Sequence, residues 1–277
     1  MELFIIAPGR RTILGNVWSG PGRSICEARR VIYHNDNQFS EAFLEPVYLD
    51  NHLLVVNKPA GMLSQADRTG DRDVLTHWKE YVRSRFNKPG NVYLGLVHRL
   101  DRPASGLMVL ARTSKAAQRL SRQFREREVI KEYVALVEGC IQTGGIFEDY
   151  LLKEGRTVRL ATESESGSQY AKMDVRPINS EGALSLVSVM LETGRPHQIR
   201  LQLSSRDYPI LGDFRYGASA QLDGKNIALH SFRLAFEHPV KKTMLTWTVP
   251  PPETWPSSFR KAILSDAACR SDVPRRD

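Results

Sequence analysis

The chain has 277 residues, 41% hydrophobic and 25% charged, and its 39 Lys and Arg exceed its 31 Asp and Glu for a formal net charge of +8. This composition is typical of a globular protein and excludes a disordered chain, a collagen or a coiled coil as the main architecture. The longest apolar runs, such as residues 3–7, end far short of the ~20 residues that a membrane helix needs.

The first residues of the chain are unlike a targeting signal. Glu2 stands where a secretory signal peptide carries basic residues, and Pro8-Gly9 interrupts the short apolar stretch. We therefore expect a cytoplasmic protein that makes no contact with a membrane.

Metal and cofactor motifs are missing from the sequence. The cysteines Cys26, Cys140 and Cys269 are odd in number and form no CxxC pair, so they predict neither a disulfide framework nor a zinc site. The seven histidines form no HExxH pair, and no phosphate-binding loop or dinucleotide fingerprint occurs. The sequence thus carries no motif for a metal or a nucleotide cofactor. A net positive charge in such a protein fits a solubilising surface or a polyanionic partner about equally.

The predicted elements begin after an irregular extension. Residues 1–43 mix Gly, Pro, Asn and Arg without periodicity and are too few for much core of their own. Residues 47–57 read as two strands joined by an Asp-Asn turn, and residues 74–86 place apolar side chains at helical spacing. Residues 107–112 then predict a short buried strand.

A basic helix is predicted next. Thr113 or Ser114 can cap its N-terminus, because a side-chain oxygen there can accept from a free backbone N–H group. Its cations lie mostly off the apolar stripe, and they are Lys115, Arg119, Arg122, Arg125 and Arg127. Such a run is usually a solvated helix face, and the alternative interpretation is a surface that binds phosphates.

Strands dominate the rest of the chain. They are predicted at residues 131–138, 170–176, 184–191, 227–236 and 243–249. Residues 197–204 fit helical spacing and strand alternation nearly equally well. Because strands outnumber helices and follow one another in neighbouring runs, the sequence predicts the α+β class with a largely antiparallel or mixed sheet.

The densest polar cluster lies within apolar sequence at residues 97–107. In it Asp101 has an arginine on each side, which would keep the carboxylate ionised and available as a nucleophile or base. Asp before Pro103 is also a common turn-capping arrangement, and spacing alone favours that structural use.

Two further clusters follow. Residues 193–200 place two arginines and a histidine around a Gly-Pro turn, which predicts either an anion site or a capped helix end. A third feature is Asp213 with Tyr216 and Gly217, for which a simple tight turn is a sufficient explanation. None of these clusters is decisive alone.

Taken together, these segments carry a family resemblance. The sequence His98-Arg99-Leu100-Asp101 followed by Ser105-Gly106-Leu107 resembles the signature of the RluA-type pseudouridine synthases. Other blocks match in the same order: residues 55–61, 123–127 with 131–133, 193–195 with 197–200, 209–213, and 229–230 through 238–239. The match spans residues 44 to 251, and ordered blocks of this extent are hard to attribute to chance.

The resemblance implies a fold and a reaction. The fold is a central, mainly antiparallel mixed sheet flanked by helices and loops, with an RNA-binding cleft and without the S4 domain that many relatives carry. The reaction is the isomerisation of a uridine in structured tRNA or rRNA to pseudouridine, with no cofactor and no metal. The implied division is an extension over 1–43, a catalytic domain over 44–262 and a polar, frayed tail over 263–277.

The resemblance also implies roles for single residues. Asp101 is the aspartate on which the chemistry depends, Tyr133 packs on the target base, and Arg200 pairs with the aspartate. Arg99 matches a residue that enters the RNA stem where the base leaves. The remaining substrate contacts are expected from His98, Arg119, Arg122, Arg195 and His197, although both histidines fit structural hydrogen bonding better than acid–base work.

The chain departs from the family pattern at two positions. Gln202 stands where relatives usually carry a histidine, which predicts altered support of the site rather than lost activity, and Ala104 replaces a frequent threonine. Two rival functions stay open at this point: a non-catalytic RNA-binding or assembly factor on the same fold, and a glycan hydrolase that uses Asp101. The hydrolase would need a second carboxylate as acid. A monomer is the simpler expectation.

Overall fold

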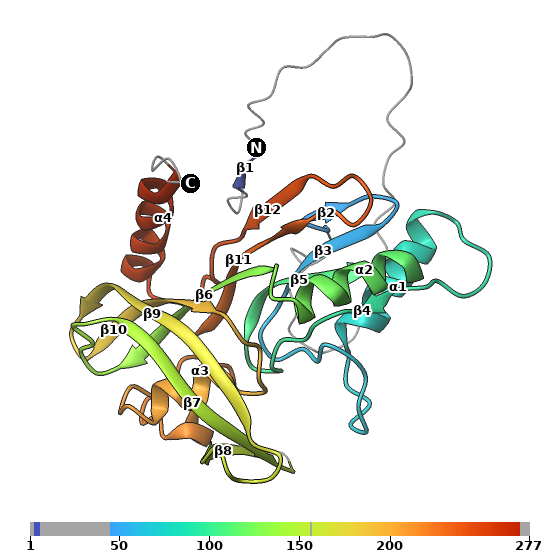
Figure 1. Ribbon diagram of the computed structural model, residues 1–277. Helices are drawn as coiled ribbons and strands as arrows, with labels where there is room; N and C mark the ends of the chain where they lie inside the picture. The colour runs from blue at the N-terminus through green and yellow to red at the C-terminus, as the bar shows by residue number, and fades with distance from the viewer. Residues whose placement is uncertain (1–2, 6–44, 156, 272–277) are drawn as a thin grey trace.

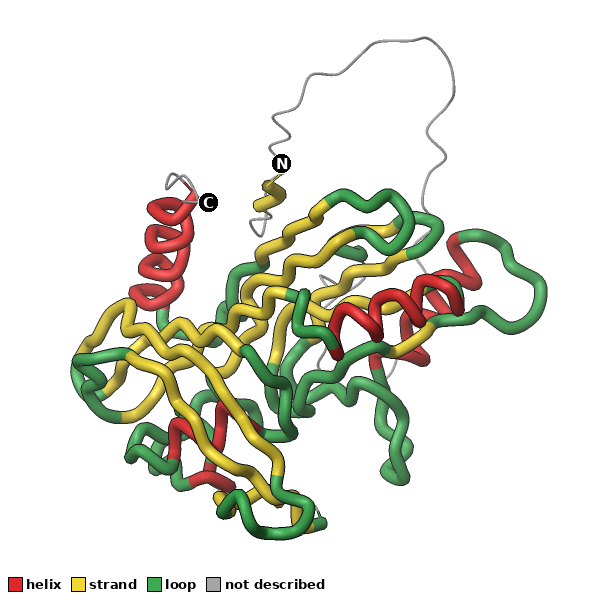
Figure 2. The backbone as a smooth tube through the Cα atoms, in the orientation of Figure 1, coloured by secondary structure: helices red, strands yellow, loops and turns green. Residues whose placement is uncertain are grey.

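The structure is a computed structural model that describes residues 3–5, 45–155 and 157–271. Its strands join in one twelve-stranded sheet (Figures 1 and 2). The order along the sheet is β2 (Tyr48–Leu49), β3 (Leu53–Lys58), β5 (Ser105–Ala111), β11 (Leu229–Glu237), β6 (Ile130–Glu138), β10 (Leu184–Leu191), β9 (Gln169–Glu181), β7 (Gly145–Glu154) and β8 (Thr157–Ala161). Outside this path, β4 (Gly95–Leu96) pairs with β5, β12 (Met244–Thr248) with β11, and β1 (Leu3–Ile5) with β12.

The sheet is mixed and mainly antiparallel, as the sequence predicts. Among the described strands, only the β1–β12 and β5–β11 pairs are parallel. The helices are α1 (Val74–Arg85), α2 (Ser114–Arg125), α3 (Gln198–Ser204) and α4 (Ser257–Ser271), with a short 3₁₀ helix η2 (Phe214–Tyr216). The α+β class is therefore confirmed, and none of the described helices is long and apolar enough to cross a membrane.

The helices α1 and α2 cover opposite faces of the β3–β5 region. Trp78 of α1 packs in one core cluster with Leu54 and Leu110, whereas Leu120 of α2 packs in a second cluster with Leu53. Both faces of these strands are thus buried, which explains their continuous apolar sequence. Figure 1 places α3 beside β7 and β8, in the other half of the sheet.

Most elements lie within a few residues of the predicted ranges. The cap of α2 is Thr113, whose side chain accepts from the backbone N–H of Ala116, and α3 settles residues 198–204 as helix. The sequence analysis missed β7 and β8, whose side chains are mostly exposed or half-buried and show little apolar alternation.

The C-terminal segment differs from the predicted frayed tail. The helix α4 continues to Ser271, because Phe259 and Ile263 are buried in the main core and Arg176 of β9 pairs with Asp266 at 2.7 Å. The prediction of fraying from residue 263 is therefore wrong as far as residue 271, and residues 272–277 lie outside the described part. The predicted extension over 1–43 lies almost wholly outside it as well.

Gly106 permits the closest approach between β5 and β11. Its φ is +115°, and a Cβ atom at this position would collide with the backbone N and O of Ser231. We expect Gly106→Ala to lower the free energy of unfolding by about 3 kcal/mol or more, from overpacking together with backbone strain. Urea denaturation measures this. Gly182→Ala is the control, since Gly182 has a φ of +61° but open space around it; equal losses in both variants would contradict the collision argument.

Asp50 joins the β2–β3 turn to the β11–β12 hairpin. Its carboxylate accepts from the backbone N–H groups of His52 and Leu53, the Tyr48 hydroxyl and His238 Nε2, all at 2.8 to 2.9 Å. Burial acts to raise the pKa of Asp50, but these hydrogen bonds outweigh it and lower the pKa from 3.8 to about 2.

A pH dependence of stability follows from this carboxylate. Because its pKa is lower in the folded state, Asp50 stabilises the fold above pH 3.8, and the contribution is lost as the pH falls to about 2. We expect Asp50→Asn to destabilise the protein near neutral pH, with the difference from wild type shrinking across that acidic window. Chemical denaturation over a pH series measures the difference, and a gap that stays constant would contradict the role of Asp50.

Candidate active site

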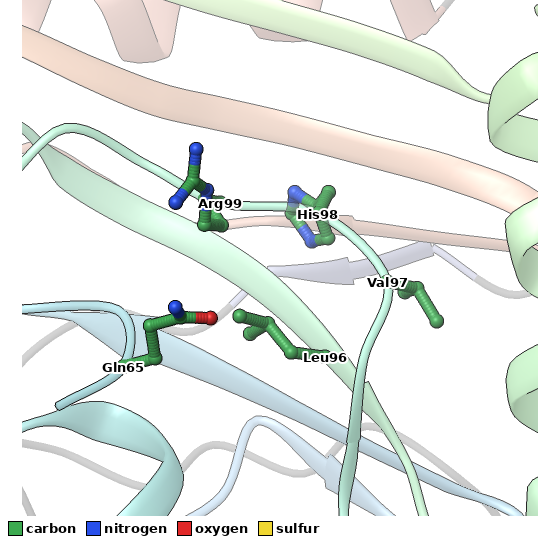
Figure 3. Close-up of a pocket in the computed structure, with 5 residues that line it drawn as sticks. All are labelled: Gln65, Leu96, Val97, His98 and Arg99. Atoms are coloured by element: carbon green, nitrogen blue, oxygen red, sulfur yellow. The ribbon is translucent and has the colours of Figure 1, made fainter.

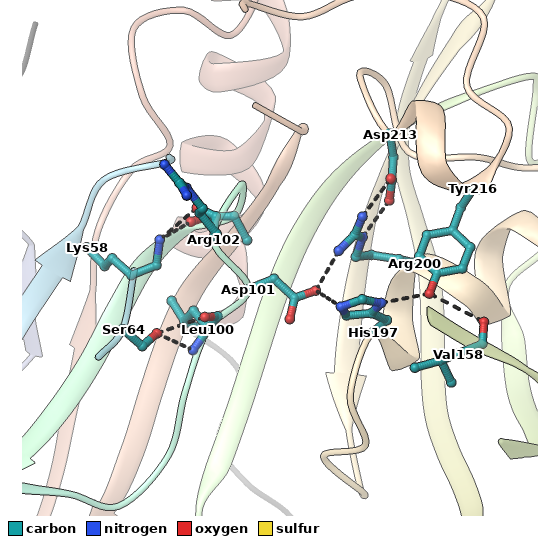
Figure 4. Close-up of polar contacts among 11 residues, drawn as sticks. Lys58, Ser64, Leu100, Asp101, Arg102, Val158, His197, Arg200, Asp213 and Tyr216 are labelled. Atoms are coloured by element: carbon teal, nitrogen blue, oxygen red, sulfur yellow. Dashed lines mark hydrogen bonds and ion pairs between the residues drawn. The ribbon is translucent and has the colours of Figure 1, made fainter. Parts of the chain in front are cut away.

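The loop that ends at Asp101 is held by two polar side chains beneath it. Lys58, at the end of β3, is 1% exposed, and its Nζ donates to the carbonyl oxygens of Arg102 at 3.1 Å and Ala104 at 2.7 Å. The Ser64 hydroxyl donates to the carbonyl of Leu100 at 2.8 Å and accepts from its N–H at 3.1 Å. The backbone on both sides of Asp101 is therefore fixed before any substrate binds (Figure 4).

Arg200 reaches Asp101 from the other half of the molecule. This residue of α3 is 4% exposed, and its Nε and Nη2 donate to the two carboxylate oxygens of Asp213 at 2.6 and 2.7 Å. Its remaining Nη1 donates to Asp101 Oδ2 at 3.0 Å. Burial acts to lower the pKa of Arg200, but Asp213 and Asp101 outweigh it and raise the pKa. One guanidinium thus serves two carboxylates (Figure 4).

The two oxygens of the Asp101 carboxylate differ in their surroundings. Oδ2 receives Arg200 and lies 3.9 Å from His197 Nε2, whereas Oδ1 has no hydrogen-bond or ion-pair partner among the described residues. The side chain is 27% exposed. Asp101 is therefore oriented through one oxygen and presents the other to a ligand.

His197 contacts Asp101 from the turn before α3. Its backbone is left-handed, with a φ of 52°, and its Nδ1 makes a 2.7 Å hydrogen bond with the hydroxyl of Tyr216. Burial lowers the pKa of His197, although the charge of Asp101 opposes this change. The imidazole is consequently neutral at pH 7, and Arg200 is the cation that faces Asp101.

Tyr133 is a buried aromatic residue near Asp101. It lies in the centre of β6, opposite Ser231 on β11 and Val189 on β10, and is 7% exposed. Burial and the charge of Asp101 raise the pKa of its phenol, while a hydrogen bond with Ser231 opposes the rise. The ring is therefore neutral, with its hydroxyl protonated, at physiological pH.

Comparison with known proteins gives this arrangement a family. The family model described as RNA pseudouridylate synthase matches residues 52–205. The ribosomal large subunit pseudouridine synthase D of Zymomonas mobilis is 32% identical over 84% of this chain and 76% of its own length. The tRNA pseudouridine synthase C of Yersinia pestis is 33% identical over 76% of this chain and 88% of its own length.

The chain belongs to the RNA pseudouridylate synthase family. The resemblance predicted from the sequence is thereby confirmed, and the protein is an RNA pseudouridine synthase. Among solved structures, human RNA pseudouridylate synthase domain containing 4 superimposes with a TM-score of 0.67 at 22% identity, over 81% of this chain and 94% of that chain. This likeness confirms the fold.

His98 and Arg99 of the synthase line a groove of about 330 Å³ with Gln65, Leu96 and Val97 (Figure 3). His98 stacks on Phe124 of α2 at 4.7 Å, and its Nε2 accepts a 2.9 Å hydrogen bond from the backbone N–H of Val109. Burial and the nearby Lys131 lower the pKa of His98 to about 3. His98 therefore has the environment of a neutral structural group, and Arg99 is exposed.

Three arginines predicted to contact RNA already have partners within the synthase. Arg119 donates to the carbonyl of Pro239 at 2.6 Å, Arg122 lies 3.4 Å from Glu126, and Arg195 donates to the carbonyl of Tyr170 at 2.9 Å. Arg119 and Arg195 are half-buried, whereas Arg122 is exposed. Of these three, Arg122 has the guanidinium most accessible to phosphate.

Sequence reasoning missed the supporting residues of the site. Lys58 stood out only as the end of a strand, and Ser64 carried no signal. The sequence indicates Asp213 only as part of a turn, because its pairing with Arg200 depends on tertiary structure. The signal that could have found Lys58 is its place at the end of an apolar strand, where the side chain can be buried. A buried ammonium group then needs several hydrogen-bond acceptors around it.

Gln202 makes polar contacts from α3 to the neighbouring strand β7. Its Nε2 donates to Asp149 Oδ2 at 2.6 Å and to the carbonyl of Phe147 at 3.1 Å, and its side chain is fully buried. These contacts tie α3 to β7. Within the described residues, no cluster of three or more His, Cys, Asp or Glu could hold a metal ion.

Proposed function

We propose that this synthase isomerises uridine in tRNA or rRNA, with Asp101 acting at C1′ of the target nucleoside. The observation that carries the proposal is the asymmetric carboxylate: Oδ2 is held by Arg200, and Oδ1 has no partner in the described chain. The names of the relatives, one acting on large-subunit ribosomal RNA and one on tRNA, supply the two substrate classes.

In the proposed reaction, Asp101 stabilises the charge that bond cleavage creates. Breaking the C1′–N1 bond leaves its electron pair on uracil and positive charge on the ribose, as in glycoside hydrolysis. A carboxylate oxygen beside C1′ stabilises that charge. The uracil then turns, C5 bonds to C1′, the proton on C5 is lost and N1 gains one, so that no atom leaves the RNA.

Tyr133 and Arg200 support this step in different ways. Arg200 keeps Asp101 ionised and oriented through a charge-assisted hydrogen bond. The neutral ring of Tyr133 offers a face on which the detached uracil packs while it turns. With its pKa raised, the phenol is a poor base at neutral pH.

The base must leave its stack before Asp101 can reach it. A uridine inside an RNA stem is inaccessible to side chains, so flipping is required, and an exposed guanidinium can fill the gap. Arg99, two residues before Asp101 and lining the groove of Figure 3, is assigned this position. A cytoplasmic location and a monomeric state complete the proposal.

Position-resolved mapping of pseudouridine tests the proposed substrate. Purified protein is incubated with total RNA from cells that lack the gene, and the modified positions are read by sequencing. We expect new pseudouridine at one or a few positions in tRNA or rRNA, and the same positions unmodified in the deletion strain. New pseudouridine confined to other RNA classes would contradict the proposal.

The exposed cations of α2 should contribute to RNA affinity without base specificity. We expect Lys115→Glu with Arg125→Glu to weaken binding and to flatten the dependence of log Kd on log salt by about 0.7–0.9 for each phosphate that the protein no longer neutralises. A salt titration with total tRNA measures the slope. Lys261→Glu on α4 is the control, and a slope unchanged by the double substitution would make α2 a solvated face only.

A further inference from the structure

A basic segment without acidic residues leads from α1 towards the active site. Residues 81–100 contain Arg83, Arg85, Lys88 and Arg99 but no Asp or Glu. The residues at 83–91 are all exposed, and in the described chain no carboxylate pairs with the first three of these cations. Their charge is therefore available to an anionic partner.

Phe86 is an exposed aromatic ring on a fixed backbone. It is the C-cap residue that follows α1, is 45% exposed, and has the guanidinium of Arg112 4.7 Å from the centre of its ring. Its N–H donates to the carbonyl of Val82 at 3.2 Å, and the N–H of Lys88 donates to the carbonyl of Arg83 at 3.1 Å. A large apolar ring supported on one side by a cation leaves its other surface for stacking.

Tyr93 is a second exposed ring, near the end of β5 where Arg112 meets Phe86. It is 49% exposed and precedes β4, whose Gly95 pairs with Ala111, the residue before Arg112. A Cβ atom at Gly95 would lie 2.9 Å from the Tyr93 hydroxyl and 2.9 Å from Cβ of Ala117. Tyr93 is thus seated beside α2, the helix whose exposed face carries the other cations.

This surface joins the active site through a continuous stretch of chain. Tyr93 is eight residues before Asp101, a span of at most about 29 Å. The groove lined by Leu96, Val97, His98 and Arg99 lies along that stretch (Figure 3). Figure 1 shows the α1–β4 loop at the outer edge of the molecule, on the side away from β7 and β8.

We propose that Arg83, Arg85, Phe86, Lys88 and Tyr93, here called the α1–β4 patch, bind an unpaired segment of the substrate RNA away from the target uridine. The inference rests on the proposed function for the identity of the RNA. Aromatic rings accept any base by stacking, and interspersed cations follow the phosphates, which is the chemistry of single-stranded nucleic-acid recognition. A blunt duplex exposes base faces only at its two ends, so the patch prefers single strands.

Binding of a uridine-free strand tests the patch separately from catalysis. The probe is a labelled RNA of alternating adenosine and cytidine, with a blunt G·C duplex of equal length as comparison. The full chain should bind the strand more tightly than the duplex. We expect Phe86→Ala and Tyr93→Ala each to weaken strand binding about tenfold and to leave duplex binding within about twofold of wild type.

Controls separate stacking from apolar contact and from charge. Leu264→Ala removes a side chain of similar exposure on α4 and should leave strand binding unchanged. Phe86→Leu should behave like Phe86→Ala if stacking is the interaction, whereas wild-type binding by Phe86→Leu would overturn the proposal. Lack of strand binding by the wild type, or equal loss in Leu264→Ala, would overturn it as well.

Failure of the patch and failure of the proposed function give different results. If the protein modifies RNA but Phe86→Ala binds the strand normally, the patch is wrong and the function stands. If strand binding depends on Phe86 but neither tRNA nor rRNA is modified, the function is wrong and the patch stands. With a modified RNA in hand, Phe86→Ala should raise KM and leave kcat within about twofold of wild type, since the ring lies far from the reacting atoms.

Discussion

Asp101→Asn is expected to abolish pseudouridine formation while the protein stays folded and binds RNA. The substitution preserves the shape of the side chain and its acceptor oxygen for Arg200 but removes the negative charge that the proposed reaction uses at C1′. Loss of an essential charged or nucleophilic group costs about 10⁴-fold or more in rate. Single-turnover assays on a mapped substrate measure the loss, and RNA affinity should stay within about threefold of wild type if Asp101 acts on the reaction rather than on binding.

A matched substitution controls for the change itself. Asp207 is exposed and has a φ of 63°, a backbone conformation that asparagine tolerates well. Asp207→Asn should therefore have wild-type activity and stability. Activity of Asp101→Asn within tenfold of wild type would remove Asp101 from the proposed reaction.

The sequence predicts where the site lies better than it predicts which side chains hold Asp101 in place. Ordered blocks identify the family, and the polar cluster around Asp101 stands out because charged residues interrupt apolar sequence. The sequence does not predict that Asp101 and Asp213 share the guanidinium of Arg200, because Arg200 lies 99 residues from Asp101 and 13 from Asp213. Only the tertiary fold brings these three side chains together.

Local pattern also explains which elements could be predicted. Strands β3 and β5 are buried on both faces and show as apolar runs, whereas β7 and β8 depend on pairing with their neighbours and mix exposed with half-buried residues. The helix α4 was missed because its polar residues conceal two buried anchors, Phe259 and Ile263.

Lys58 shows that a charged residue type does not always predict an exposed side chain. A lysine at the end of a strand predicts a solvated side chain, yet its Nζ lies within 3.1 Å of four carbonyl oxygens. Burial lowers its pKa to about 7, opposed by the charge of Asp101. The fold uses the lysine to gather the loop carbonyls around the active site, and such a role depends on residues 44 and 46 positions away.

Removing one partner of the buried Arg200–Asp213 pair should have the largest effect on stability. Asp213→Asn leaves Arg200, 4% exposed, with Asp101 as its remaining anionic partner. Breaking a buried ion pair from one side typically costs about 3–5 kcal/mol, because the other charge stays desolvated. We expect a loss of that size in the free energy of unfolding by urea denaturation. Activity should fall too, since Arg200 no longer holds Asp101 at a fixed position.

A double-mutant cycle separates the pair from its surroundings. The cycle compares Arg200→Met, Asp213→Leu and the variant that carries both substitutions. The double variant removes both charges of the pair, so its loss of stability should be smaller than the sum of the two single losses by at least about 1 kcal/mol. Glu237→Gln disrupts the exposed Lys242–Glu237 pair and should cost less than about 1 kcal/mol. Additive losses would mean that Asp213 supports only the turn around it. A non-additive cycle, together with low activity in Asp213→Leu where Arg200 is intact, would assign Asp213 to positioning Asp101 through Arg200, at a site that Asp213 itself does not touch.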